Sequence, residues 1–303
     1  MSSFDIEPLH DDHVDEVIAV INAAFGFDRS DDWYRWKHRE GPWGPSRGVI
    51  ARDRRGIVGA RLLLPWRFTG PAGALEAHRA VEAATAPRAQ GQGIFSLVNR
   101  HLMEATSSRG TGLIFSTPNE RSRGGYLKLG WSWLTPVPHV WRPVLPRRQR
   151  GDRPLEGIDA TAWYRPAPPA DRVATAWSPA SVAWRLDSRS DHRYRVLASS
   201  DGAAGLAYRR LDRRRFEALL PIIAWGDRRR RRGLLHEAAR RERAGLVLDT
   251  DEPGGATISG TAGKRHGESL LAVWPTPSLS LDDWPVNDVR NWHVSFADLE
   301  NVL

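Results

Sequence analysis

The chain has 303 residues, 41% of them hydrophobic, which is enough for two domains with cores of ordinary size. It has no cysteine, so disulfides, thiolate zinc sites and a cysteine nucleophile are excluded. The formal net charge of +8 comes almost wholly from arginine. Net charge alone says little about specific partners, so it does not indicate nucleic-acid binding, and we expect no nucleic-acid ligand.

The amino-terminal stretch MSSFDIEPLHDDHVDEV is too acidic and too weakly apolar for a signal peptide. No apolar run approaches the ~20 residues that a membrane-spanning helix needs. We therefore expect a cytoplasmic protein that does not enter a membrane. Most of the fourteen tryptophans are expected in the cores or between domains, and some of them in an acceptor cleft.

Hydrophobic periodicity predicts the elements in chain order. A helix is expected over 11–25, with Val14, Val17, Ile18, Ile21 and Phe25 on one face, and a second helix follows. Further on the pattern predicts a hairpin with strands 48–53 and 56–68, a strand 75–85, a helix from 94, a short buried strand within 111–119, a short helix within 120–131 and a strand 131–144.

The second half of the chain repeats the order of the first. Segment 143–155 is rich in proline and charge, so we place a linker at 146–155, between a domain 1–145 and a domain 156–303. An internal duplication is predicted because three segments match in order, at offsets of 148, 146 and 140: Trp36-Lys37 with Trp184-Arg185, Gly59-Ala60-Arg61 with Gly205-Leu206-Ala207, and Gly93-Ile94-Phe95 with Gly233-Leu234-Leu235.

The stretch ATAPRAQGQGIF, residues 84–95, has features of an anion-binding turn. Gly91 and Gly93 lack side chains, so backbone N–H groups can approach a ligand closely. The helix that follows adds unpaired N–H donors and a partial positive charge, and Arg88 adds a full charge. The alternative is an ordinary tight turn between a strand and a helix. The motif is neither a Walker motif nor a G-x-G-x-x-G fingerprint.

The spacing R-x-x-G-x-G at Arg88, Gly91 and Gly93, followed by an amphipathic helix, a short strand and STPNERSRGGYLKLGW, resembles the GNAT superfamily of N-acyltransferases over residues 4–142. The resemblance implies a mixed α/β (α+β) fold with two GNAT-like modules, each a splayed mixed sheet flanked by helices. The tandem layout resembles the enhanced-intracellular-survival acetyltransferases and mycothiol synthase, without the sterol-carrier-like domain of the former.

The resemblance also implies a coenzyme site. Acetyl-CoA, or another acyl-CoA, is the expected co-substrate, and no metal is expected. The residues that would hold its pyrophosphate are Arg88, Ala89, Gln90, Gly91, Gln92 and Gly93, while Ala83, Ala84 and Thr85 would run beside pantetheine. Asn119 matches a family position near the coenzyme, and it also fits the cap of a helix.

Acyl transfer needs a proton for the leaving thiolate and an amine without its proton. Tyr126 matches the family position that gives this proton; the alternative is a core tyrosine. Glu82 is the first candidate for the base, and His78 lies on the same face if the strand is regular. Glu82 could instead merely pair with an arginine such as Arg61 or Arg79, and some members of the family use no dedicated base.

The second half carries arginines 228–232 where the first has its glycines, so we expect one active site and a degenerate second module. The expected acceptor is the primary amine of a small molecule, such as an aminosugar, an aminoglycoside-like compound or a biosynthetic intermediate. Asp282, Asp283 and Asp298 could meet a cationic acceptor, or they could equally be solvated. The alternatives are a non-catalytic acyl-CoA-binding or scaffold protein and the acylation of a protein. A homodimer is possible.

Overall fold

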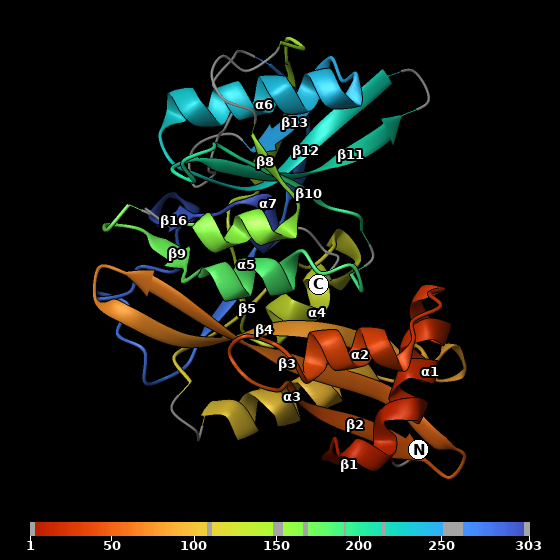
Figure 1. Cartoon of the computed structure of the whole chain (residues 1–303). Coiled ribbons are helices and arrows are strands. Elements are labelled where there is room, and N and C mark those ends of the chain that lie inside the picture. The colour runs from red at the N-terminus through yellow and green to blue at the C-terminus, as the bar shows by residue number, and fades with distance from the viewer. Residues whose placement is uncertain are drawn as a thin grey trace.

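The computed structural model describes residues 4–107, 111–147, 154–165, 169–190, 192–213, 216–250 and 263–299. These residues form two mixed β-sheets, one above the other in Figure 1, with helices outside and between them. The helices are α1 (Val14–Phe25), α2 (Asp31–His38), α3 (Ile94–Ser107), α4 (Arg123–Lys128), α5 (Pro179–Arg185), α6 (Arg228–Glu242) and α7 (Phe296–Leu299). Short 3-10 turns are η1 (Asp11–His13), η2 (Pro87–Ala89), η3 (Glu120–Ser122), η4 (Ile158–Trp163) and η5 (Val289–Asn291).

The first sheet is built mainly from the amino-terminal half. Its strands lie in the order β1 (Asp5–Pro8), β2 (Arg47–Asp53), β3 (Gly56–Gly70), β4 (Gly73–Thr85), β5 (Leu113–Ser116), β15 (Ala272–Pro275) and β6 (Ser132–Trp133). Two short strands, β9 (Val173–Thr175) and β16 (Trp292–His293), extend it beside β3. Strands β4 and β5 are parallel, and they pair only from Ala77↔Leu113 to Arg79↔Phe115 before they diverge.

The second sheet repeats this arrangement. Its order is β14 (Lys264–Ser269), β7 (Val137–Pro143), β13 (Leu246–Thr250), β12 (Phe216–Trp225), β11 (Gly205–Arg213), β10 (Arg195–Ala198) and β8 (Leu155–Glu156). The parallel pair β12–β13 is held by only two registered positions and then opens, as β4–β5 does. The predicted fold class, with two splayed mixed sheets flanked by helices, is confirmed.

Each sheet receives one strand from the other half of the chain. Strand β7 pairs with β13 and β14 in the second sheet, although it directly follows β6 of the first. Strand β15 fills the equivalent place in the first sheet, between β5 and β6. The predicted division at 146–155 therefore does not separate the strands of the two sheets. As a statement about folding units it stays a prediction, and residues 148–153 of the linker lie outside the described residues.

The predicted strand 131–144 is wrong as a single element. The structure divides it into β6 and β7, which belong to different sheets. Between them the N–H of Leu134 donates to the carbonyl of Leu271 at 2.9 Å, and Pro136 has no N–H to offer a ladder. Alternation of apolar residues continues across this break, so the hydrophobic pattern alone did not reveal it.

Helices cover the outer faces of both sheets and fill the space between them. Figure 1 shows α3 below the lower sheet and α6 above the upper one, each over its own apolar cluster. A larger cluster between the sheets includes residues of α1, α2, α5 and α7. No helix of the described residues is both long and apolar enough to span a membrane.

The matched tryptophans of the two halves meet at the centre of this layer. The indole N–H of Trp36 on α2 donates to the carbonyl of Trp184 on α5 at 2.9 Å, and that of Trp184 donates to the carbonyl of Trp36 at 2.9 Å. Their rings stack with centroids 5.6 Å apart. Two equivalent residues that contact each other reciprocally lie on a local pseudo-two-fold axis, which supports the predicted duplication.

Of the other two sequence matches, one coincides with the structural repeat and one does not. Gly59-Ala60-Arg61 and Gly205-Leu206-Ala207 lie on the corresponding strands β3 and β11. Gly93 directly precedes α3, whereas Gly233 lies inside α6, so these two glycines are not equivalent in position. The duplication therefore rests on the strand order and on the other two matches.

Candidate active site

The predicted anion cradle connects β4 to α3. The N–H of Ala86 still bonds the carbonyl of Val58 at 2.8 Å, and the chain then turns through η2. Gly91 and Gly93 have φ angles of 77° and 80°, which residues with a Cβ rarely adopt. Nothing lies within 4 Å of a Cβ built at either glycine, so they are needed for the backbone conformation rather than for space.

The cradle has the donors that an anion requires. Within the described residues, the backbone N–H groups of Gly91, Gln92 and Gly93 donate no hydrogen bond. They precede the first turn of α3, whose N–H groups also point along the helix axis. Ala89 is buried beneath the loop, and the side chains of Gln90 and Gln92 fold back to the carbonyls of Thr85 and Arg88, each at 3.4 Å. The loop therefore presents three backbone N–H groups that are free to donate to an anion.

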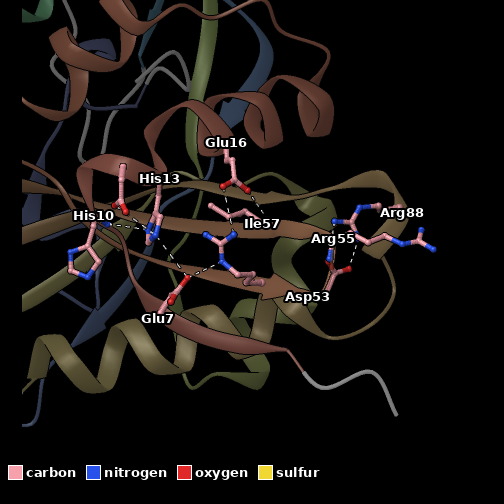
Figure 2. A network of polar contacts seen from close by, with 10 residues as sticks. Glu7, His10, His13, Glu16, Asp53, Arg55, Ile57 and Arg88 are labelled. Atoms are coloured by element: carbon pink, nitrogen blue, oxygen red, sulfur yellow. Dashed lines mark hydrogen bonds and ion pairs between the residues drawn. The ribbon is translucent and has the colours of Figure 1, made fainter.

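The guanidinium of Arg88 is held by Asp53 at the end of β2, as Figure 2 shows. A second bond, from Nη2 to Oδ1, measures 3.2 Å, and the N–H of Arg55 also donates to Oδ1 at 2.8 Å. Bonding to Arg88 lowers the pKa of Asp53. Because a guanidinium has five N–H groups, Arg88 keeps donors for a phosphate while Asp53 orients it.

A cavity of about 300 Å³ lies where β4 and β5 diverge. The tyrosine and the strand residues that the sequence singled out meet here: Tyr126, Glu82, Ala83 and Asn119 line it. Ala84 is buried behind them, and Thr85 leads into the cradle. The carboxamide of Asn119 accepts from the N–H of Ser122 at 3.1 Å, so it caps η3 while it lines the cavity.

The Tyr126 hydroxyl is fixed by two polar neighbours. It accepts a hydrogen bond from Nη2 of Arg61 at 2.7 Å, and it lies 3.1 Å from the hydroxyl of Ser116. The rings of Phe95 and Trp131 pack edge-on against the phenol, with centroids at 5.5 and 4.8 Å. These contacts hold the hydroxyl in one position at the wall of the cavity.

Glu82 lies in a β-bulge of strand β4. Between the pairs Leu62↔Val81 and Ala60↔Ala84, two residues of β4 oppose the single residue Arg61 of β3. Glu82 has a φ of 51°, one of two positive values among non-glycine residues of the described chain. A bulge redirects the side chain that it contains. The carboxylate of Glu82 is thereby turned toward α2, where Oε1 bonds the ammonium of Lys37.

The bulge separates Glu82 from His78. The two would share a face of a regular strand, but His78 lies opposite Ile114, which belongs to the apolar cluster with α3, and its Nδ1 is 3.3 Å from the Thr111 hydroxyl. Burial lowers the pKa of His78 to about 4, helped by the charge of Arg47. The structure therefore does not bring His78 to the cavity with Tyr126.

Sequence reasoning missed four basic residues of the site: Lys37, Arg29, Arg61 and Arg79. Burial lowers the pKa of the fully buried Lys37 to about 8, although Glu82 acts in the opposite direction. The guanidinium of Arg29 lies 3.8 Å from Glu82. Arg61 and Arg79 were considered only as partners of Glu82, but Arg61 bonds Tyr126 and Arg79 bonds the Thr117 hydroxyl at 2.8 Å. One signal was present: Lys37 follows Trp33 by one helical turn, on an apolar face.

The described connection between β12 and α6, which corresponds to the β4–α3 loop, does not form an equivalent cradle. Only Gly226 and Asp227 separate β12 from α6, and the Asp227 carboxylate accepts from the N–H of Arg230 at 3.0 Å, at the helix start. This places a negative charge where the first module offers free donors. The arginine run 228–232 is mostly exposed. Residues 251–262, where a counterpart of Tyr126 would fall, lie outside the described residues.

The three carboxylates predicted to meet a cationic acceptor do not line the cavity that holds Tyr126. Asp282 and Asp283 are exposed in a turn. Asp298 is buried, and it accepts from the hydroxyl of Thr175 at 2.6 Å and from the N–H and hydroxyl of Ser295, both at 2.8 Å. Asp298 lines a different cavity, together with Tyr164 and Trp177, so its expected contact with a cationic acceptor stays a prediction.

Comparison with known proteins shows which domain family and which solved structures the chain is similar to. Residues 5–134 match the acetyltransferase (GNAT) domain family. A GCN5-related N-acetyltransferase from Anabaena variabilis is 10% identical with a TM-score of 0.67, covering 90% of this chain and 73% of that one. One from Kribbella flavida is 14% identical with a TM-score of 0.63, covering 89% and 71%. Eis1 from Mycobacterium abscessus is 14% identical with a TM-score of 0.61, covering 89% and 73%.

No curated protein sequence matches the chain. The family match and the fold shared with these structures agree with the cradle and the splayed strands described above. The first module therefore matches the GNAT domain family over residues 5–134, and the chain as a whole shares the fold of these GNAT structures.

Proposed function

We propose that the protein is an acyl-CoA-dependent N-acyltransferase that transfers acetyl from acetyl-CoA to the primary amine of a small molecule. One observation carries this proposal. The buried hydroxyl of Tyr126 lines a cavity where β4 and β5 diverge. The loop with the free backbone N–H groups follows at the end of the same strand β4. A proton donor and an anion cradle joined by one splayed strand are what thioester aminolysis needs.

The cradle fits the pyrophosphate of the coenzyme. The residues that would hold it are Arg88 to Gly93, with the N–H groups of Gly91, Gln92 and Gly93 as free donors. The edge of β4 beyond Arg79 is not paired with β5, so the backbone at Ala83 to Thr85 can run beside the pantetheine arm. When bound, the coenzyme supplies a thioester carbonyl carbon for the amine to attack.

Two side chains handle the protons. The carboxylate of Glu82 takes a proton from the acceptor amine, directly or through a water molecule; its Oε2 atom makes no hydrogen bond with the described residues. As the C–N bond forms and the C–S bond breaks, the Tyr126 hydroxyl gives its proton to the thiolate sulfur. Arg61 stabilises the phenolate that remains, because its Nη2 already donates to that oxygen.

Thiol release tests this proposal. The enzyme is mixed with acetyl-CoA and a broad panel of amines, and free thiol is followed together with the acetylated product. Acetyl-CoA at a hundredfold excess over its dissociation constant should stabilise the fold by about 2.7 kcal/mol. Calorimetry should give one coenzyme per chain, since the second module has Asp227 in place of a cradle. Absence of binding by any acyl-CoA at millimolar concentration would exclude the function.

A further inference from the structure

Two exposed phenylalanines lie at one end of the Tyr126 cavity. Phe25 ends α1 and Phe27 follows it by two residues, and both line the cavity although they are 45% and 46% exposed. Among the large apolar residues that are exposed in the described part of the chain, these two also line the cavity together with Tyr126. Apolar surface left open beside a ligand cavity marks a contact surface for the ligand.

The end of helix α1 does not account for the exposed ring of Phe27. Gly26 has a φ of 71°, and its N–H and that of Phe27 both donate to the carbonyl of Asn22, at 2.8 and 3.3 Å. In a cap of this kind the apolar residue after the glycine usually packs against the last helical turn and is covered there. Phe27 instead stays nearly half exposed and lines the cavity.

The loop that carries the two rings is fixed in position. The side chain of Asn22 accepts from the N–H of Arg29 at 2.9 Å and donates to the carbonyl of Arg29 at 3.0 Å, which closes the loop. The guanidinium of Arg29 lies 4.2 Å from the ring centroid of Phe27, and the rings of Phe25 and Phe27 lie 5.7 Å apart. Rings that are ordered before the ligand arrives lose little conformational entropy on binding.

The two rings lie on the acceptor side of the cavity. Tyr126 and the side chain of Glu82, to which proton transfer is assigned, are buried, so the exposed rings form the entrance. Helix α3, which follows the coenzyme cradle, packs in the apolar cluster that contains Tyr126. Helices α1 and α2, which flank the loop with the rings, pack in the cluster between the two sheets. The entrance is therefore separated from the coenzyme by the sheet that carries the site.

We infer that the acceptor is an amphipathic primary amine whose aryl ring packs against Phe25 and Phe27 while its amine reaches Glu82. This inference rests on the proposed function, and it narrows the acceptor from small amines in general to arylalkylamines. An aryl ring fits this entrance because aromatic rings bury apolar area and prefer edge-on or offset contacts with one another. Phe25 and Phe27 are then specificity residues that take no part in proton transfer.

Pairs of amines that differ by one phenyl ring test the inference. Benzylamine is compared with methylamine, 2-phenylethylamine with ethylamine, and 4-phenylbutylamine with butylamine, by calorimetry on the full chain saturated with coenzyme A. In at least one pair the aryl amine should bind about tenfold more tightly or better, because its ring leaves water and contacts two aromatic side chains. Equal binding within every pair, or no binding by any aryl amine, would overturn the inference.

Variants of the two phenylalanines give the second readout. Phe25→Ala and Phe27→Ala should each lower the preference for the aryl amine by roughly threefold or more, and the double variant should abolish most of it. Half-exposed side chains contribute little to stability, so the variants should fold, and their affinity for acetyl-CoA should equal that of the wild type. An undiminished preference in the double variant would refute the assignment to these rings.

Phe216→Ala is the matched control. Phe216 is 40% exposed, as Phe25 and Phe27 are, but it lies at the start of β12 in the second sheet and does not line the Tyr126 cavity. Its replacement should leave the preference for the aryl amine at the wild-type value. An equal loss of preference in this variant would show a general effect of removing surface phenylalanines, and it would overturn the inference.

Two other occupants of the entrance would give different results. If the rings bind a long acyl chain, the double variant should lose affinity for octanoyl-CoA but not for acetyl-CoA, with the amine preference unchanged. If they bind a second copy of the chain, the double variant should differ from the wild type in mass by sedimentation, again with the amine preference unchanged. Either result would overturn the inference.

The two proposals fail separately. Amine binding is measured without turnover, so the wild-type preference decides this inference even if no amine releases thiol. Conversely, thiol release that is as fast with the amines lacking an aryl ring as with their aryl partners would support the acyltransferase and overturn the aryl acceptor.

Discussion

The hydroxyl of Tyr126 has two roles in the structure, because it is the proposed proton donor and also the acceptor for Arg61. Removing it leaves a buried guanidinium N–H without this partner. The loss of stability therefore cannot separate a catalytic tyrosine from a structural one, and only the rate and the coenzyme affinity can do so.

Tyr126→Phe should lower the turnover number by roughly 10²-fold or more, because general-acid transfer to the thiolate is lost. Unfolding free energy should fall by about 1–3 kcal/mol, since Arg61 loses its acceptor. Coenzyme affinity should not change. The control is Ser116→Ala, which removes the neighbouring hydroxyl at 3.1 Å but leaves the proton donor in place. An unchanged turnover number with saturating substrates would remove Tyr126 from the mechanism.

His78 illustrates a residue whose chemistry is set by burial. Its folded pKa of about 4 lies below the reference value of 6.5, so between these values the unfolded chain binds a proton that the folded chain does not. The contribution of His78 to stability is therefore complete above pH 6.5 and is lost as the pH falls toward 4.

In His78→Gln this part of the acid sensitivity should disappear. The difference in unfolding free energy between pH 7 and pH 5, measured with urea, should shrink by roughly 1–2 kcal/mol relative to the wild type. Turnover at pH 7 should be retained within about twofold, because His78 lies outside the Tyr126 cavity. A hundredfold loss of turnover in a folded variant would instead restore His78 as the base.

Among the elements, the loop between β4 and α3 is determined by its local sequence, whereas the bulge of β4 is determined by residues distant in sequence. The glycine spacing predicted the loop, because a positive φ and free N–H donors need glycine at defined places. The bulge has no such marker: Glu82 adopts a φ of 51° in a strand that reads as regular. It depends on the register with β3 around Arg61 and on the ion pair between Glu82 and Lys37, both distant in sequence. The sequence pattern therefore placed Glu82 and His78 on one face.

Two substitutions of Gly91 separate backbone strain from charge. Gly91→Ala adds a methyl group at a φ of 77° in open space, so it should cost about 1 kcal/mol of stability and leave most coenzyme binding. Gly91→Glu has the same strain and adds a negative charge at the cradle. Its acetyl-CoA affinity, measured by calorimetry, should fall at least about tenfold below that of Gly91→Ala. Equal affinities of the two variants would mean that the cradle is assigned to the wrong loop.

For the whole molecule, local patterns predicted most helices and strands and the duplication, and the fold class followed from the resemblance to the GNAT superfamily. They did not predict that β7 pairs in the second sheet and β15 in the first. The pairing of distant residues such as Ser116 and Ala272 does not change the hydrophobic periodicity of either strand. The basic residues that line the Tyr126 cavity were missed for the same reason, because Arg29, Arg61 and Arg79 come together only in the tertiary structure.

The exchange makes each half depend on the other. A chain of residues 1–145 lacks β15, so β5 and β6 would have no partner between them, and it should not show a cooperative melting transition by calorimetry. Co-expression with 146–303 should restore a soluble complex that binds acetyl-CoA. A stable, monomeric 1–145 that melts cooperatively would show that the predicted domain boundary is also a folding boundary.

The place of β15 also determines when the protein can become active during its synthesis. Strand β5, which carries Ser116 beside Tyr126, leaves the ribosome about 160 residues before the strand that pairs with its open edge. At about 5–20 residues per second the edge waits roughly 10–30 s, exposed to other nascent chains. A chain that stops short of residue 272 cannot close the sheet that carries the site. The site can thus be completed only after residues 272–275 have been synthesised, and chains terminated before them are left for chaperones and proteases.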